Sequence, residues 1–354
     1  MHIYKNEPSR YTSSQYEKGE RRMEGEKGIV CVTGGAGHLA SWLIMRLLQH
    51  GYFVRTTVRS DPKFKEDISH LKSLPEAAEK LEVFEADLEK PESFSEAING
   101  CIGVFHVAHP MEYEQKVSQE TIIKISVEGT LGILKSCLKS KTVKRVVYTS
   151  SIAAAISMSN DIKEINENVW TEVDIVKNLE GPTVSYAVSK TLTERAALEF
   201  AEEHGLDVVT ILPSIIVGPS ISNNLPVSTA LALSSILDQE EYKTLKKAPK
   251  PPAAVHIDDI VSAEIFLFES PKAKGRYICS TVDITARDVA KFIATKYPEL
   301  LLSTDLSKEF KEEEEEKPVH ISSDKLLSIG FKFKYGFEDM YDDAIQYCKE
   351  KGFL

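Results

Sequence analysis

Tyr186 and Lys190 are the two side chains with the clearest chemical use in this sequence. They stand four residues apart in a stretch, 185–204, that predicts a helix, so both side chains share one helical face. A free tyrosine has a pKa near ~10, and a neighbouring positive charge lowers that pKa by favouring the phenolate. The spacing therefore predicts a phenol that can shuttle a proton near neutral pH. The same spacing occurs on ordinary amphipathic helices, so the surrounding sequence has to decide.

A glycine-rich segment near the start of the chain predicts a phosphate-binding turn. It lies between an apolar run, 29–33, and a helical pattern, 38–50, which is the context that a dinucleotide-binding turn requires. We expect glycines there to permit the tight turn and the close approach of the pyrophosphate, while free N–H groups of the helix bind the anion. A purely structural turn is the alternative, and Ala40 stands where a third glycine is usual. The expected cofactor contacts are Gly34, Gly35, Gly37, His38 and Leu39.

Basic residues follow the second predicted strand, 53–58. A guanidinium such as Arg59 pairs well with a phosphate, and Lys65 is close behind, so this segment favours NADP. Asp61 keeps NAD open, since a carboxylate there would bind the ribose hydroxyl. The alternative for Arg59 is an ordinary surface arginine.

Three further strand ends carry side chains that we expect at the same edge of the sheet, because this fold binds its ligand at the carboxyl ends of its strands. Asp87 and Leu88 are expected near the adenine, and Val107, Ala108 and His109 along the cofactor. A lone histidine at such a place is usually a packing residue, so His109 is not assigned as an acid or base.

The pair Ser150 and Ser151 ends the fifth predicted strand. A hydroxyl there can donate a hydrogen bond to a substrate carbonyl or to the alkoxide that forms from it. The glycine-rich turn, the basic residue, the serine and the Tyr-x-x-x-Lys spacing then follow one another in the order of a dehydrogenase.

Strand and helix patterns alternate along residues 28–213, which predicts an α/β fold with a doubly wound parallel Rossmann sheet. We expect this NAD(P)-binding domain to have six strands and to include the catalytic helix. Residues 1–27 read as a disordered leader. Residues 214–354 carry helix patterns and one strand pattern, 276–279, too few strands for a sheet of their own. They are expected to form mainly a smaller C-terminal α/β substrate-binding cap, with some segments returning to the Rossmann domain.

Composition excludes several classes of protein. The 354 residues carry a net charge of −11, which argues against nucleic acid and anionic membranes as partners. No apolar run reaches the roughly 20 residues that span a bilayer. The five scattered cysteines predict buried or free thiols, no metal site and a cytoplasmic location. The run Glu312 to Glu316 reads as a solvated segment.

Several strings in the chain resemble the extended short-chain dehydrogenases, within them the plant group of dihydroflavonol reductase and vestitone reductase. The resemblance covers residues 28–354 and is carried by segments 32–37, 141–145, 147–151, 186–192 and 255–259. Segments 39–46, 59–64 and 331–335 are most similar to the noscapine synthase subgroup.

This resemblance implies roles for individual residues. Tyr186 would donate or accept the proton, Lys190 would lower its pKa and bind the nicotinamide ribose, and Ser151, rather than Ser150, would orient the reacting oxygen. Pro213 and Ile216 would pack on the nicotinamide. Two departures stand out. Ser126 occupies the place of an asparagine that serves a proton relay in many members, and Ile156 that of the asparagine with which dihydroflavonol reductase reads its substrate.

This resemblance, together with the motifs, implies an NAD(P)-dependent oxidoreductase of plant specialised metabolism that acts on CH–OH groups. In the noscapine-synthase-like version it oxidises an alkaloid hemiacetal to a lactone. The alternative is an NADPH-dependent reductase of an isoflavonoid or phenylpropanoid ketone, and a third is a Rossmann-fold binding protein without catalysis. The cofactor is NADP(H) or NAD(H), the partner a small alkaloid or phenolic substrate, and the oligomeric state is open.

Overall fold

The computed structural model of the protein describes residues 27–59, 67–110, 117–157, 162–178, 182–237, 239, 242, 245, 252–301 and 319–354. The predictions for the leader before Lys27, for Lys65 and for the run Glu312 to Glu316 lie outside these residues.

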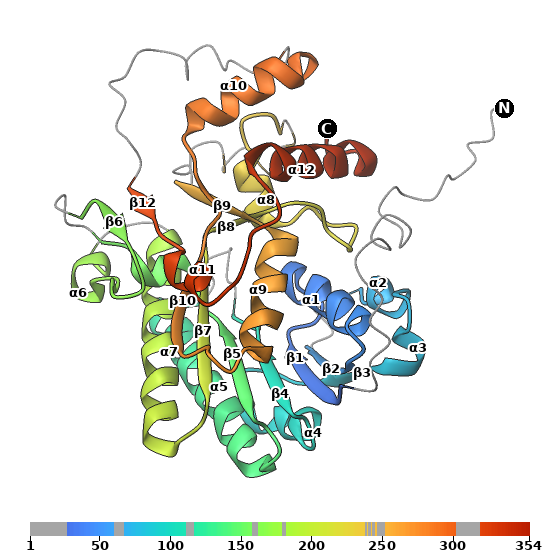
Figure 1. The fold of residues 1–354 in the computed structure, drawn as a ribbon, viewed down its shortest axis with the longest axis vertical. Coiled ribbons are helices and arrows are strands. Elements are labelled where there is room, and N and C mark those ends of the chain that lie inside the picture. Colours follow the sequence, from blue (N-terminus) through green and yellow to red (C-terminus); the bar gives the residue numbers. More distant parts are fainter. Residues whose placement is uncertain are drawn as a thin grey trace.

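Seven parallel strands form the main sheet, in the order β10-β7-β5-β4-β1-β2-β3 (Figure 1). From β1 the chain winds outward in one direction through β2 and β3, and in the other through β4, β5 and β7. The doubly wound α/β fold is thus confirmed, with its topological switch between β1 and β4. All residues of β5 and β7 are buried, as expected for a sheet covered on both faces. The strands are β1 (Ile29–Thr33), β2 (Phe53–Val58), β3 (Leu81–Glu85), β4 (Gly103–His106), β5 (Arg145–Thr149), β7 (Val208–Pro213) and β10 (Gly275–Cys279).

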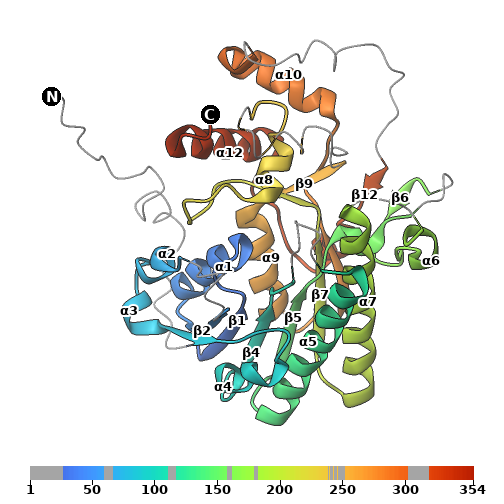
Figure 2. The same ribbon diagram turned by 180° about the vertical axis from the view of Figure 1, so that it is seen from behind.

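Helices cover both faces of this sheet (Figures 1 and 2). One face carries α1 (His38–Gln49) and α9 (Ile257–Glu269), which contact each other and share one apolar core with β1 and β7. The other face carries α4 (Ser95–Ile98), α5 (Gln119–Ser140) and α7 (Pro182–His204). Helix α5 begins where the Ser118 hydroxyl accepts a hydrogen bond from the Thr121 N–H at 3.3 Å. Catalytic-helix candidate α7 therefore lies against α5, on the face opposite α9.

A second, three-stranded sheet forms in the C-terminal part, so the prediction of no separate sheet there was wrong. It contains β8 (Ile215–Val217), β9 (Ala253–His256) and β11 (Val282–Asp283), in the order β11-β9-β8. Strands β8 and β11 contain only three and two residues, too few for a pattern to show, and β8 follows β7 after a single residue. Helices α8 (Val227–Ala232), α10 (Ala286–Lys296) and α12 (Phe337–Lys351) pack around this sheet in a separate core. We call these six elements the C-terminal module.

Other C-terminal segments belong with the main sheet. Strand β10 adds the seventh strand at its edge, one more than the six predicted for residues 28–213. Helix α9 packs on β5 and β7, and α11 (Asp324–Ser328) packs on β10. Strand β12 (His320–Ile321) pairs in parallel with β6 (Glu164–Ile165).

The remaining elements are short. Helices α2 (Ser69–Lys72) and α3 (Ala77–Lys80) lie between β2 and β3. The described residues also contain the 3-10 turns η2 (Pro91–Phe94), η3 (Ile152–Ala155) and η5 (Pro298–Leu301), and helix α6 (Val173–Val176).

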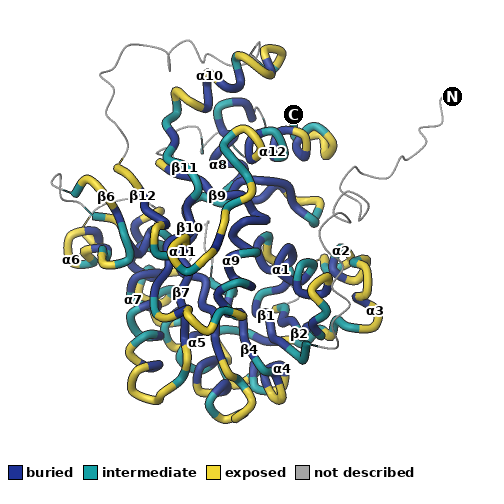
Figure 3. The backbone as a smooth tube through the Cα atoms, in the orientation of Figure 1, coloured by how far each residue is buried: buried dark blue, intermediate teal, exposed yellow. Residues whose placement is uncertain are grey.

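Burial follows the layers: β1, β4, β5, β7 and β10 of the main sheet are almost entirely buried, whereas the edge strand β3 is intermediate to exposed (Figure 3). All five cysteines are buried and free. Within the described residues, no helix is long and apolar enough to cross a bilayer.

Candidate active site

The carboxyl ends of β1, β4, β5 and β7 meet at one edge of the main sheet, and most candidate residues lie there. The strand register sets this arrangement: Thr33 is level with His106, and Thr149 with Ile211. The next strand across, β10, ends at Cys279 opposite Pro213. An edge built from parallel strand ends is where an α/β sheet binds its ligand.

The glycine-rich turn after β1 has no room for side chains. Gly34 adopts a φ of +74°, in the left-handed region that favours glycine, and its N–H donates to Thr57 Oγ1 at 3.2 Å. A Cβ on Gly35 would lie 2.1 Å from Thr56 Oγ1, and one on Gly37 would lie 3.2 Å from the Gly34 carbonyl oxygen. The turn therefore presents bare backbone at the sheet edge, as a bound pyrophosphate requires.

Helix α1 starts directly behind this turn. Gly37 is its N-cap residue and the first turn carries no acidic side chain, so nothing there competes with a bound anion for the helix dipole. Ala40, in place of the third glycine, is fully buried. The residues present thus fit the phosphates of a dinucleotide.

His38, the first residue of α1, makes a side-chain hydrogen bond with the segment that follows β8. Its Nε2 lies 2.9 Å from the Pro219 carbonyl oxygen and must donate, since a carbonyl only accepts. Burial lowers the pKa of His38 to about 4, so the imidazole is neutral near pH ~7. His38 therefore fastens the glycine-rich turn to the segment that follows β8, and Leu39 beside it is buried.

The residues predicted near the adenosine half lie at the neighbouring strand ends. Arg59 is exposed directly after β2. The Asp87 N–H donates to Ser93 Oγ at 2.9 Å, which closes the turn after β3, and Leu88 packs against Gly129 of α5.

A buried network holds the turn after β4 against β1. Thr33 Oγ1 accepts the N–H groups of Val107 at 3.1 Å and Ala108 at 3.0 Å, so its one proton goes to His106 Nδ1 at 3.0 Å. His106 then carries its proton on Nε2 and donates to Thr130 Oγ1 at 2.8 Å. Burial lowers the pKa of His106 to about 3, so the ring is a neutral tie between β1, β4 and α5.

Tyr186, Ser151 and His109 meet in front of this edge. The Ser151 side chain lies near the Tyr186 hydroxyl and acts to lower its pKa, and Ser151 Oγ accepts the Ala153 N–H at 3.2 Å. The His109 ring contacts the Tyr186 ring edge-on, with 5.6 Å between centroids. His109 Nε2 is buried and has no hydrogen-bond partner within the described residues. Burial holds the pKa of His109 well below its ordinary value, so it lines the site as a neutral ring.

Lys190 lies on the same face of α7 as Tyr186, with its Nζ 5.9 Å from the centre of the tyrosine ring. The expected lowering of the Tyr186 pKa is not the net result here: burial raises that pKa, and the nearby Ser151 side chain opposes the rise. The physical reason is that Lys190 is itself buried, and desolvation lowers its own pKa, which weakens it as a fixed positive charge.

The Lys190 ammonium donates to the Thr149 carbonyl oxygen at 2.9 Å. The hydroxyl of the same threonine donates to Glu264 Oε1 of α9 at 2.6 Å. Glu264 is fully buried, its Oε2 has no partner within the described residues, and burial raises its pKa.

Ser150 is occupied elsewhere. Its Oγ donates to Glu194 Oε2 at 2.7 Å, and Glu194 also accepts from Thr210 Oγ1 at 2.6 Å and from Arg276 Nε at 2.9 Å. Of the two serines, only Ser151 is therefore left to face Tyr186.

The remaining predicted positions are placed as follows. Ser126 Oγ donates to the Ile122 carbonyl and accepts from Ser189 Oγ at 2.8 Å, which ties α5 to α7. Pro213 ends β7, Ile216 lies in β8 and Ile156 is exposed after η3. No group of three or more histidine, cysteine or acidic side chains within the described residues could hold a metal ion.

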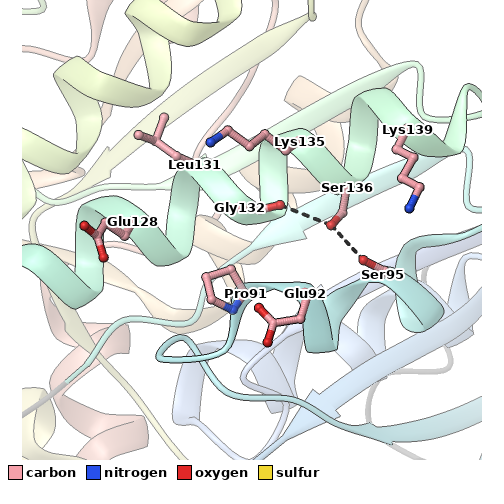
Figure 4. A pocket seen from close by; sticks show the side chains of 9 residues that line it. All are labelled: Pro91, Glu92, Ser95, Glu128, Leu131, Gly132, Lys135, Ser136 and Lys139. Atoms are coloured by element: carbon pink, nitrogen blue, oxygen red, sulfur yellow. Dashed lines mark hydrogen bonds between the residues drawn. The ribbon is translucent and has the colours of Figure 1, made fainter.

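A separate groove of about 510 Å³ lies between η2, α4 and the outer side of α5 (Figure 4). It shares no residue with the site described above. Its lining is mixed in charge and open to solvent: Pro91, Glu92, Ser95, Glu128, Leu131, Gly132, Lys135, Ser136 and Lys139.

Sequence reasoning missed Glu194 and Glu264. Glu264 could have been noticed, because it falls within the apolar stripe of α9, where Ile260, Val261 and Leu267 are buried. Glu194 gives no such signal, since α7 is buried on several sides.

Comparisons with known proteins agree with this geometry. Residues 30–279 match the NAD dependent epimerase/dehydratase family. The chain is 58% identical to noscapine synthase SDR1 of Papaver somniferum over the full length of both proteins. It is 44% identical to vestitone reductase of Medicago sativa, covering 93% of this chain and 99% of that one.

Solved structures give the same fold. The crystal structure of vestitone reductase from alfalfa superposes with a TM-score of 0.79 at 43% identity, over 93% of this chain and all of that one. The yeast methylglyoxal/isovaleraldehyde reductase Gre2, complexed with NADPH, superposes with a TM-score of 0.78 at 24% identity, over 92% of this chain and all of that one.

These findings confirm the predicted family and the nicotinamide dinucleotide cofactor, NAD(H) or NADP(H), whose phosphates the bare glycine-rich turn fits. The chain belongs to the NAD dependent epimerase/dehydratase family, as an oxidoreductase of the short-chain dehydrogenase type related to noscapine synthase and to the plant flavonoid reductases.

Proposed function

We propose that this protein oxidises a cyclic hemiacetal of a bulky plant alkaloid to a lactone, with Ser151, Tyr186 and Lys190 as its catalytic residues. The observation that carries the proposal is the convergence of Ser151 and Lys190 on Tyr186 at the sheet edge that bears the glycine-rich turn. Full-length identity of 58% with noscapine synthase supports the substrate class.

Each residue has a defined part in the reaction. Ser151, fixed by the Ala153 N–H, donates to the substrate oxygen and orients it. Tyr186 accepts the proton of the hydroxyl group as the C–O double bond forms. Lys190, when protonated, places a positive charge 5.9 Å from the centre of the Tyr186 ring, which acts against the effect of burial and favours the phenolate. A bound oxidised nicotinamide supplies the hydride acceptor.

The cofactor and the substrate would be held by different parts of the chain. Gly34, Gly35 and Gly37 would bind the pyrophosphate, and Pro213 and Ile216 would pack on the nicotinamide. The C-terminal module would act as the substrate cap, because its first strand, β8, begins directly after β7 ends at the ligand-binding edge of the main sheet. In addition, His38 binds the Pro219 carbonyl oxygen, in the segment that follows β8, and so connects this part of the chain to the glycine-rich turn.

A second candidate is an NADPH-dependent ketone reductase that uses the same residues in reverse. Two observations favour it: the 44% identity with vestitone reductase and Arg59 at the end of β2, where a guanidinium would pair with a 2′-phosphate. Incubation with an alkaloid hemiacetal and NAD, or with an isoflavonoid ketone and NADPH, separates the two, with the absorbance of reduced nicotinamide as readout. No turnover of any alkaloid hemiacetal would refute the first candidate.

Substitution of Tyr186 by Phe tests the catalytic assignment. We expect the turnover rate to fall by about 100-fold or more, because the phenol is the proton shuttle, while dinucleotide affinity is kept. Tyr148→Phe, which removes a buried hydroxyl on β5 that makes no hydrogen bond within the described residues, is the matched control and should keep most activity. Unchanged turnover in Tyr186→Phe would instead indicate a binding protein or another proton shuttle.

A further inference from the structure

The link between Lys190 and Glu264 runs through one residue and joins the two faces of the sheet. Thr149, the last residue of β5, accepts from Lys190 Nζ with its carbonyl and donates to Glu264 with its hydroxyl, at 2.9 and 2.6 Å. Lys190 comes from α7 on one face and Glu264 from α9 on the other. Lys190 is 4% exposed and Glu264 is fully buried, so both side chains are desolvated.

Two buried carboxylates favour the charged form of Lys190, and they differ in what neutralises them. Glu194 exerts the larger attraction, but its charge is already paired with Arg276 at 2.9 Å and bound by two hydroxyls. Glu264 has only the Thr149 hydroxyl and one oxygen without a partner within the described residues. A buried carboxylate with an unbonded oxygen either takes up a proton, the direction in which burial moves the Glu264 pKa, or needs a cation nearby. Lys190 is the cation whose charge opposes that rise.

We propose that Glu264 is a positioning residue of the active site, the buried counter-charge that holds the Lys190 ammonium in place through Thr149. The inference rests on the proposed function only for the role of Lys190 in turnover. It predicts that the two groups gain or lose charge together, since each one makes the charge of the other less costly.

The other ionisable groups around the pair are set apart from it by burial or by partners of their own. Burial holds the pKa values of His106 and His109 below their ordinary range and those of Tyr148, Tyr186 and Cys279 above it. Asp259 on α9, whose pKa burial raises, accepts the N–H groups of Lys334 and Tyr335 and faces away toward that segment. Glu194 and Arg276 form their own ion pair. A change seen near neutral pH is therefore assigned to Lys190 and Glu264.

The test measures Lys190 directly, without substrate. Protein labelled with ¹³C at the lysine ε carbons is titrated, and the Lys190 signal is assigned by its loss in Lys190→Met. In Glu264→Gln, which keeps size and removes the charge, the pKa of Lys190 should fall by about one pH unit relative to the wild type. Glu269→Gln is the matched control on the same helix, because Glu269 binds Lys27 and Tyr52 instead.

A second variant keeps the test decisive if Glu264→Gln does not fold. Thr149→Val removes the only hydroxyl that Glu264 accepts from within the described residues, and it should lower the Lys190 pKa in the same direction. An identical Lys190 titration in the wild type and the variant that folds would overturn the proposal and show a merely structural tie.

Turnover adds an independent readout. With the substrate that the turnover assays of the proposed function identify, the pH profile of kcat should shift in Glu264→Gln and not in Glu269→Gln. If no substrate is turned over, the proposed function fails while the lysine titration still decides this inference. Normal turnover with an unshifted lysine would leave the function standing and reject the role of Glu264.

Discussion

Glu194 and Glu264 are both fully buried, and both accept a hydrogen bond of 2.6 Å from a threonine of the main sheet. Thr210 of β7 serves Glu194 on the face of α7, and Thr149 of β5 serves Glu264 on the face of α9. Their further contacts are different. Glu194 is paired with Arg276, whose guanidinium also lies 3.5 Å from the centre of the Trp170 ring. Glu264 has no cation in direct contact within the described residues.

This difference separates a residue that stabilises the fold from one that is held for the site. A carboxylate whose bonds are all made fixes the elements that supply the donors, here β7, β10 and the segment before η3. A buried carboxylate with one oxygen that lacks a hydrogen-bond partner keeps part of its desolvation cost. Residues that carry such a cost are concentrated at functional sites.

The largest loss of stability should follow from breaking the buried ion pair between Glu194 and Arg276. Arg276→Met leaves a buried carboxylate without its cation, so we expect the free energy of unfolding to fall by about 3–5 kcal/mol. Urea denaturation followed by circular dichroism measures this. Arg55→Met, which breaks an ion pair with the exposed Glu82 side chain, is the control and should cost less than ~1 kcal/mol. An equally small loss in Arg276→Met would remove the distinction between the two glutamates.

An intermediate effect should come from deleting each threonine hydroxyl in turn. Thr210→Val and Thr149→Val both remove one bond to a buried carboxylate, at a cost of about 1 kcal/mol of stability each. Only Thr149→Val should also shift the pH profile of turnover, because only Glu264 acts on Lys190 without a cation of its own. The same shift in Thr210→Val would mean that Glu194 controls the lysine.

The smallest effect should come from an acidic residue that is only partly buried, in contrast to the two fully buried glutamates. Asp283 of β11 binds His320 of β12 at 2.6 Å and raises the pKa of that histidine. The pair therefore contributes stability below the ordinary histidine pKa of ~6.5, and the contribution is lost as pH rises through the raised pKa.

Urea denaturation of His320→Gln at about pH 5.5 and about pH 9 measures this contribution. We expect a loss of less than ~1 kcal/mol at the lower pH and almost none at the higher one. A larger loss at the higher pH would show that His320 acts through packing rather than charge.

Local patterns were sufficient for most of the main sheet and for the cofactor turn. An apolar run or a glycine-rich turn can be recognised from the residues next to it in the chain. Accordingly, β1, β2 and α1 lie where the patterns predict them. The sheet of the C-terminal module was missed because β8 and β11 contain only three and two residues. The seventh strand of the main sheet was found as a strand, but its parallel pairing with β7 depends on contacts more than sixty residues away.

The sequence by itself determined the chemistry available to this protein: a glycine turn, a strand-end serine and a tyrosine with its lysine. These depend on spacing within single elements, which the backbone geometry of helices and strands dictates. Only the tertiary structure decided which charges those residues feel. Burial raises the pKa of Tyr186, and Glu264 reaches Lys190 across the end of β5, because desolvation and charge pairing depend on what packs around a group rather than on its place in the chain.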